Sequence, residues 1–263
     1  TRQHLRLMQP EDFDEALACH SRFAAKNHGM VEKFEEEVRA ARDDIQVRRI
    51  GYYDDGQLRG YAAYRFESAS DSNYTQNRLS VEELVYEDGA VLRALLGALK
   101  LQEDLAQTAI LRTGEEDFHH LLDDPQDVSK TYIDYGFLQT NVSAIGTMFK
   151  LVDGESFVAK TAYRPFPAGD LTAAFRYRDE MAGCEKQLHI AFAGGRWSVA
   201  AADSAADITV TCRQGDLASL LMGSCELEAM LRLGAVTVDD NAQAQELARL
   251  LHCGQKPWLN SDY

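Results

Sequence analysis

The sequence is short of basic residues, and this shortage excludes one large class of partners. It has 27 Lys and Arg residues against 42 Asp and Glu residues, which leaves a net charge of -15. Nucleic-acid binding depends on clustered basic side chains that neutralise phosphates, so nucleic acid is not expected as a partner. The excess of negative charge instead favours cationic ligands, amines in particular.

Cysteine is also scarce, and long apolar runs are missing. There are five cysteines, an odd number, and no two of them stand three positions apart. Such usage favours reduced thiols in a cytoplasmic protein over disulfides or a zinc site. No apolar run approaches the ~20 residues of a membrane span, and no signal peptide is visible at the start, so we expect no role at a membrane.

Common catalytic and nucleotide-binding motifs are absent as well. There is no Gly-x-Ser-x-Gly elbow, no Walker loop and no Gly-x-Gly-x-x-Gly. His119 and His120 stand among acidic residues and suggest a metal site, but neighbouring helical side chains point about 100° apart. We therefore interpret this pair as a solvated helix start and expect no metal-binding residues.

The hydrophobic pattern changes at about Asp153 and predicts two α+β modules. The first alternates strands and helices, with a hairpin whose turn is Asp54-Asp55-Gly56. The second has a strand meander followed by helices, with Gly223 and Gly234 at positions typical of helix C-caps. A further strand is predicted over Ala144–Val152, where the pattern again alternates.

The end of the chain is unusually apolar. Lys256-Pro257-Trp258-Leu259 precedes the last four residues, Asn260-Ser261-Asp262-Tyr263. Most chain ends are polar and frayed, so an end of this composition predicts a tail held against protein. A held tail places the terminal α-carboxylate, with a pKa normally near ~3.5, at a defined position, as an anchor or as a catalytic base.

The strand–hairpin–strand–helix order of residues 5–107 resembles a GNAT acetyltransferase domain. That family holds the acetyl-CoA pyrophosphate on a Gln/Arg-x-x-Gly-x-Gly/Ala loop at a helix N-terminus. The equivalent stretch here is residues 87–97, where Arg93 lies four residues before Gly97 and Leu99 takes the second small position. Glu87 and Asp88 would also repel a pyrophosphate, so we predict that this module has no cofactor-binding residues for acetyl-CoA.

The whole chain resembles the last two domains of the Eis-like (enhanced intracellular survival) acetyltransferases. The matching segments are Gly60–Arg65, Leu79–Leu84, Met148–Asp153, Ala206–Ile208, Leu217–Gly223 and the aromatic C-terminus. The resemblance implies a GNAT-like domain without the pyrophosphate loop at 1–149 and a sterol-carrier-like domain at 150–263. It also implies that the family's N-terminal catalytic GNAT domain, with its acetyl-CoA site, is absent from these residues, so this chain alone is expected to be inactive.

By the same resemblance, the Tyr263 carboxylate is the general base that deprotonates the acceptor amine, and Asp262 helps to bind the cationic substrate. The implied co-substrate is acetyl-CoA, the implied acceptors are aminoglycosides or lysine side chains, and the implied partners are the N-terminal GNAT domain and further copies of the chain.

Two other functions stay open from the sequence. A sterol-carrier-like fold can enclose an apolar ligand, for which Leu220, Leu221, Met222, Met230, Leu231 and Leu233 are candidate lining residues. Their helical spacing is equally typical of a packed core. A purely structural oligomerisation unit is the third reading.

Overall fold

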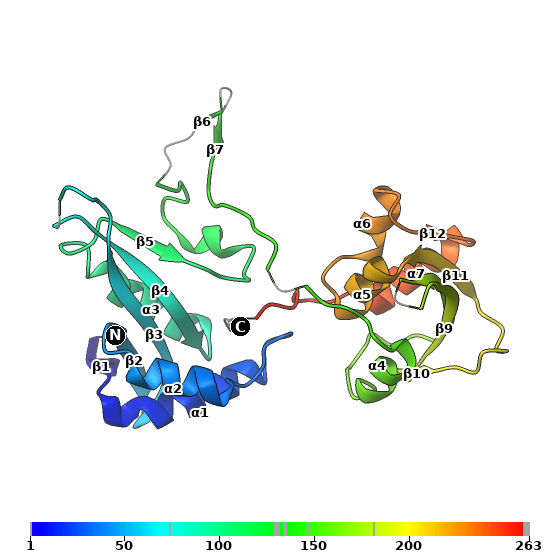
Figure 1. Ribbon diagram of the computed structural model, residues 1–263, viewed down its shortest axis with the longest axis horizontal. Coiled ribbons are helices and arrows are strands. Elements are labelled where there is room, and N and C mark those ends of the chain that lie inside the picture. Colours follow the sequence, from blue (N-terminus) through cyan, green and yellow to red (C-terminus); the bar gives the residue numbers. More distant parts are fainter. Residues whose placement is uncertain are drawn as a thin grey trace. The chain divides into compact units, whose positions relative to one another are not determined.

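The computed structural model describes residues 2–73, 75–128, 132–133, 136–146, 148–180 and 182–259, and it divides into two compact units (Figure 1). The first unit runs to Gly146 and also includes Trp258 and Leu259 of the C-terminal tail. The second runs to Pro257. Each unit has its own mixed sheet and its own core, so the predicted α+β class is confirmed.

The first unit is built on a five-stranded sheet in the order β1-β2-β3-β4-β5. The first four strands are antiparallel neighbours, while β4 and β5 are parallel. The strands are β1 (Leu5–Leu7), β2 (Arg48–Asp54), β3 (Gln57–Ser68), β4 (Asn77–Tyr86) and β5 (Thr108–Leu111). The helices are α1 (Phe13–Ala24), α2 (Glu35–Asp43) and α3 (Gly89–Lys100), with short 3-10 helices at Arg2–His4, Pro10–Asp12 and Phe118–Leu121. A separate hairpin joins β6 (Tyr132–Ile133) to β7 (Phe137–Leu138).

Strand alternation divides the core of this unit between the two faces of the sheet. Tyr61 and Ala63 of β3 pack with α1, whereas Ala62 and Tyr64 of the same strand pack with α3. Because successive side chains in a strand point to opposite faces, one apolar strand can supply both layers. The result is a sheet covered on both sides, which matches the continuous run of small and aromatic residues in β3.

The predicted hairpin turn is confirmed between β2 and β3. Asp55 and Gly56 both adopt positive φ, +48° and +77°. Two successive positive φ angles are the geometry of a two-residue hairpin turn, and Asp-Gly is one of the sequences that tolerates it.

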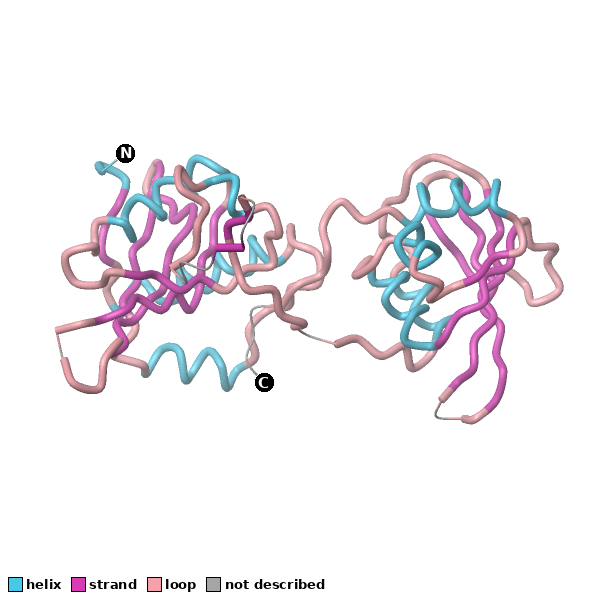
Figure 2. Tube along the Cα trace, turned by 90° about the horizontal axis from the view of Figure 1, so that it is seen from above, coloured by secondary structure: helices cyan, strands magenta, loops and turns pink. Residues whose placement is uncertain are grey.

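The second unit has a five-stranded sheet in the order β10-β9-β8-β11-β12, in which only the β8–β11 pair is parallel. Figure 2 shows its helices (cyan) packed beside its strands (magenta). The strands are β8 (Leu171–Asp179), β9 (Cys184–Ala193), β10 (Arg196–Val199), β11 (Ile208–Arg213) and β12 (Thr237–Val238). The helices are α4 (Gly154–Lys160), α5 (Gln214–Met222), α6 (Leu227–Arg232) and α7 (Asn241–Leu251).

The two predicted C-cap glycines are confirmed. Gly223 and Gly234 have φ of +73° and +70°, in the left-handed region where a side chain would be strained. Gly223 ends α5, and Gly234 follows α6 after Leu233. Both helices therefore stop where the sequence provides a residue that can reverse the backbone.

The predicted strand over Ala144–Val152 is wrong. The described residues of this segment form no strand, and Ile145, Met148 and Val152 are exposed. Alternating apolar residues form a strand only when a neighbouring strand pairs with them and a core takes up one face. No described strand pairs with this segment, and of its described residues only Leu151 is buried in the core of the second unit, so its pattern is not expressed as regular structure.

Candidate functional site

The N-terminus of α3 is the position at which a GNAT fold would hold a pyrophosphate, and here a carboxylate of the chain itself lies there. Asp88 is the N-cap, and its Oδ1 accepts hydrogen bonds from the amides of Ala90 (2.8 Å) and Val91 (3.0 Å). The bonds from Val91 and Ala90 lower the pKa of the Asp88 carboxyl below its usual range. The amides at this helix end therefore already have an anionic partner.

Glu87, immediately before this cap, binds the nearest arginines. Its carboxylate lies 2.9 Å from Arg22 Nε and 2.9 Å from Arg59 Nη2, and its side chain is almost fully buried. Arg22 also donates to the carbonyl oxygen of Leu58 at 2.6 Å. Both guanidinium groups are thus neutralised within the domain. Two carboxylates and two engaged arginines do not fit a pyrophosphate, which agrees with the failed loop pattern in the sequence.

The cap at Asp88 makes a prediction for stability. Asp88→Ala is expected to destabilise the chain by about 1 kcal/mol, within the range of ~0.5–2 kcal/mol for a lost N-cap. Because the folded-state pKa is depressed, this stabilisation is present above the ordinary value of 3.8 and is lost as the pH falls through the folded pKa.

Urea unfolding of wild type and variant at pH 7 and at pH 3 measures the difference at each pH. Asp88→Ser, which keeps a capping oxygen, is the matched control and should stay close to wild type at pH 7. An equal difference between wild type and Asp88→Ala at both pH values would contradict the capping role.

A fork opens in the sheet beside this helix end, because β5 is much shorter than β4. The two strands pair from Arg78–Thr108 to Val81–Leu111, after which residues 112–114 leave the sheet. No described strand pairs with the last part of β4 on this side. A small pocket lies in the fork, and Trp258 forms one of its walls. We use the name tail socket for the surface that receives Trp258, formed by Gly114 and the other residues that line this pocket. Those other lining residues are Leu84, Tyr86, Leu111, Arg112, Thr113 and Phe118.

Trp258 is held in the tail socket by contacts on two sides. Its backbone amide donates to the carbonyl oxygen of His28 at 3.1 Å, and its side chain packs against the cluster between α1 and the sheet. Gly114 lies directly against the indole, since a Cβ at Gly114 would come within 2.4 Å of Trp258 Cγ. The predicted attachment of the tail to protein is thus confirmed as far as Trp258.

A second group of ionisable side chains lies on the α1 side of the sheet. Glu83 of β4 forms an ion pair with Lys33 (2.6 Å) and accepts a hydrogen bond from the Tyr61 hydroxyl (2.9 Å). Burial raises the pKa of the Tyr61 phenol well above its usual value and lowers the pKa of the nearby His20 imidazole. One carboxylate oxygen of Glu83 pairs with Lys33, and the other accepts from Tyr61. Glu83, Lys33 and Tyr61 line neither of the two pockets described here, so we assign this group no binding role.

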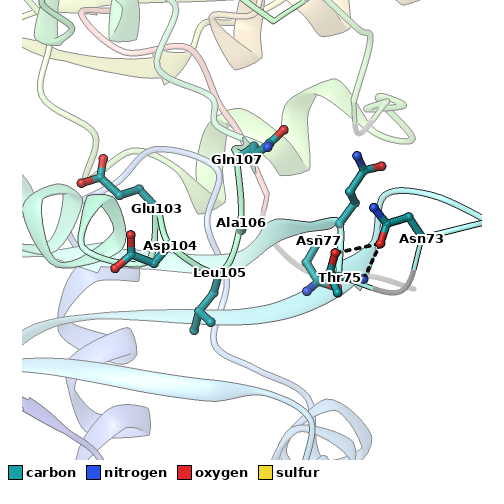
Figure 3. Close-up of a pocket in the computed structure, with 9 residues that line it drawn as sticks. Asn73, Thr75, Asn77, Glu103, Asp104, Leu105, Ala106 and Gln107 are labelled. Carbon is teal, nitrogen blue, oxygen red and sulfur yellow. Dashed lines mark hydrogen bonds between the residues drawn. The ribbon is translucent and has the colours of Figure 1, made fainter.

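A second pocket, larger than the one beside Trp258, carries no catalytic arrangement. It lies between the β3–β4 loop and the segment that follows α3, with a volume of about 310 Å³. Figure 3 shows the side chains of Glu103 and Asp104 on the α3 side, and on the loop side Asn73 bound to the hydroxyl and amide of Thr75. Its polar groups are carboxylates, amides and the Thr75 hydroxyl, which donates to Asn73, and no cationic side chain is among the lining residues, so it is not our candidate site.

The two site residues predicted from the sequence, Asp262 and Tyr263, lie outside the described residues, and their roles stay predictions. His119 and His120 lie in the 3-10 helix Phe118–Leu121, with ring centroids 4.2 Å apart. Among the described residues, no group of three or more His, Cys, Asp or Glu side chains is placed to hold a metal ion. All five cysteines are free thiols, and no helix in the described ranges is long and apolar enough to cross a bilayer.

The candidate lining residues of an apolar tunnel do not share one cavity wall. Leu220, Leu221 and Met230 are buried in the core of the second unit, whereas Leu233 is 76% exposed. The helical spacing of Leu220, Leu221 and Met230 thus reflects the packing of α5 and α6 in this core. Leu233 lies outside the core.

Comparison with known families and structures identifies the class of each unit. Residues 27–138 match the acetyltransferase (GNAT) domain family, and residues 155–260 match the sterol carrier protein domain family. No curated protein sequence matches the chain. The chain therefore carries a GNAT acetyltransferase domain followed by a sterol-carrier-like domain.

Several solved structures share this fold over both units. A GCN5-related N-acetyltransferase from Kribbella flavida is 18% identical over 98% of this chain and 59% of its own (TM-score 0.64). Eis1 from Mycobacterium abscessus is 19% identical over 99% and 62% (TM-score 0.69). A probable N-acyltransferase from Enterococcus faecalis is 16% identical over 98% and 61% (TM-score 0.73). The chain thus spans about three fifths of the length of these structures.

Proposed function

We propose that this chain supplies the second GNAT domain and the C-terminal sterol-carrier-like domain of an Eis-like, acetyl-CoA-dependent N-acetyltransferase of the cytoplasm. The single observation that carries the proposal is the succession of the two domains in one chain. The three N-acyltransferase-like structures described above share it across nearly the whole of this sequence, at 98–99% coverage.

The local geometry supports a division of labour between domains. The N-terminus of α3 holds the Asp88 carboxylate, and the arginines beside it are paired with Glu87. Binding of acetyl-CoA, which supplies the acetyl group, is therefore assigned to a further, N-terminal GNAT domain of the same protein. In this proposal residues 1–149 buttress the substrate cavity, and the last residues of the chain supply groups that act on the acceptor.

The acceptor is a primary amine of the aminoglycoside or lysine class. The net charge of -15 favours a cationic substrate. The α-carboxylate of Tyr263 acts as the general base that deprotonates the acceptor amine, and the Asp262 carboxylate attracts the positive charge of the substrate. Homo-oligomers of this chain, without nucleic acid or membrane as partners, complete the proposal.

Titration of this chain with acetyl-CoA tests the assignment of the binding site. We expect no saturable heat by isothermal calorimetry, because the amides at the N-terminus of α3 already bind the Asp88 carboxylate, and Arg22 and Arg59 are paired with Glu87. The variant Asp88→Ala is the matched control: it removes the cap but leaves Glu87 paired, so it should remain silent too. A saturable isotherm in the micromolar range for wild type would show that this GNAT domain binds acetyl-CoA, against the proposal.

A further inference from the structure

The fork between β4 and β5 contains a close contact between two residues that are far apart in the sequence, Gly114 and Trp258. Trp258 lies over Gly114, and its Cγ, Cβ and Cδ2 atoms would stand 2.4, 2.6 and 2.8 Å from a Cβ at position 114. Non-bonded carbon atoms normally approach only to about 3.5–4.0 Å. Any residue larger than glycine would therefore push the indole out of this position.

The backbone does not explain the glycine. Gly114 is not among the described residues with positive φ, so another residue could adopt its conformation without strain. The three atoms nearest to a Cβ at this position all belong to the Trp258 side chain. Gly114 is thus shaped to receive a ring from a residue 144 positions further along the chain (114 to 258).

The remaining contacts of Trp258 fix its backbone as well as its ring. Its amide donates to the carbonyl oxygen of His28 in the segment that follows α1, and Trp258 lines the same small pocket as Tyr86 and Phe118. Pro257 immediately before it has a restricted φ, which reduces the freedom of the chain that enters the socket. A ring, an amide and a rigid preceding residue together define both the position and the direction of the tail.

We propose that Gly114 and Trp258 form a lock that fixes where the C-terminal tail begins on the GNAT domain. Resting on the proposed function, this makes Trp258 a positioning residue for the carboxylate base. Its contribution is orientation, because a base acts only within hydrogen-bond reach of the proton.

Gly114→Ala tests the lock in this chain without any assay of activity. The matched control is Gly146→Ala, which adds the same methyl group at a glycine with no atom within 4 Å and without positive φ. Amide hydrogen exchange of the C-terminal peptide, read by mass spectrometry, reports the Trp258 amide that bonds to His28. We expect Gly114→Ala to accelerate this exchange at least ~10-fold and Gly146→Ala to leave it unchanged. Equal exchange in the two variants would overturn the lock.

A second variant covers the case in which Gly114→Ala disturbs the fold around it. Trp258→Ala removes the ring and leaves the socket intact, so exchange in the peptide that contains Gly114 should rise while the core of the sheet stays protected. If that peptide exchanges as in wild type, the ring does not cover Gly114 and the lock fails.

The positioning role is tested in the protein that also carries the catalytic GNAT domain. Trp258→Ala should lower kcat by about 10- to 100-fold, the range expected for a misplaced catalytic group, with the KM for acetyl-CoA unchanged. Trp258→Phe, which keeps a ring over Gly114, should restore most of the rate. An unchanged kcat in Trp258→Ala would refute the positioning role. Amide hydrogen exchange tests the lock independently of activity. The proposed function is tested separately, by removing Asp262 and Tyr263 and measuring acetyl transfer.

Discussion

Removal of Asp262 and Tyr263 from the longer protein proposed above, which would include a catalytic GNAT domain, is expected to reduce kcat for acetyl transfer by about 10²- to 10⁴-fold, the usual contribution of a general base. The deletion moves the α-carboxylate back by two residues, from a tail whose start is held at Trp258. A base that is two residues short no longer reaches the amine. Steady-state kinetics with an aminoglycoside and with a lysine peptide measure the loss for each acceptor class.

Two further variants separate the effects within the tail. Asp262→Asn keeps the terminal carboxylate but removes one charge, so it should raise the KM for the cationic amine far more than it changes kcat. Gly254→Ala, at a glycine with open space around it and no positive φ, is the control for a substitution in the tail that should have no effect. Full activity of the deletion variant, with a normal unfolding transition, would end the catalytic role of the carboxylate.

Phe175→Ala is expected to produce the largest loss of stability, about 3–5 kcal/mol for the second unit. Phe175 is fully buried (0% exposed) on β8, the central strand of the sheet, and belongs to the core formed with the helices. Truncation to alanine removes the transfer free energy of the ring and leaves a cavity that strands on both sides prevent from closing.

Urea unfolding followed by Trp197 fluorescence reports this loss, since Trp197 is buried in the same core. Phe175→Leu, which keeps most of the volume, should lose clearly less than Phe175→Ala. Tyr163→Ala, at a side chain that is 77% exposed, should stay within about 0.5 kcal/mol of wild type. A loss in Phe175→Ala no larger than that of Tyr163→Ala would contradict this description of the core.

Most of the secondary structure follows from local pattern. Asp-Gly at positions 55–56 predicted the hairpin turn, and Gly223 predicted the end of α5. In each case the residue type has a backbone or capping preference that operates over a few positions. Such preferences are readable without tertiary structure.

The error over Ala144–Val152 has the opposite cause. Ile145, which is 92% exposed, and its apolar neighbours have the alternation of a half-buried strand. A strand also needs a partner, and no local signal says whether one is present.

For the C-terminal tail, the sequence predicted the attachment to protein but not the residue that receives it. Its composition alone indicated attachment, because Pro, Trp and Leu near a chain end are costly to leave in water. The receiving residue had no signal of its own: Gly114 is one of 18 glycines, and nothing in its neighbours marks it as a socket.

By itself the sequence determined the two α+β modules, their turns and caps, and the carboxylates that occupy the N-terminus of α3. These depend on interactions between residues a few positions apart. Only the tertiary structure decided that Trp258 fills the fork beside Tyr86 and meets Gly114, because that contact joins distant segments through shape. Glycine has no side chain and so adds nothing to the hydrophobic pattern. The role of Gly114 can therefore be recognised only in the tertiary structure, where the Trp258 side chain lies against it.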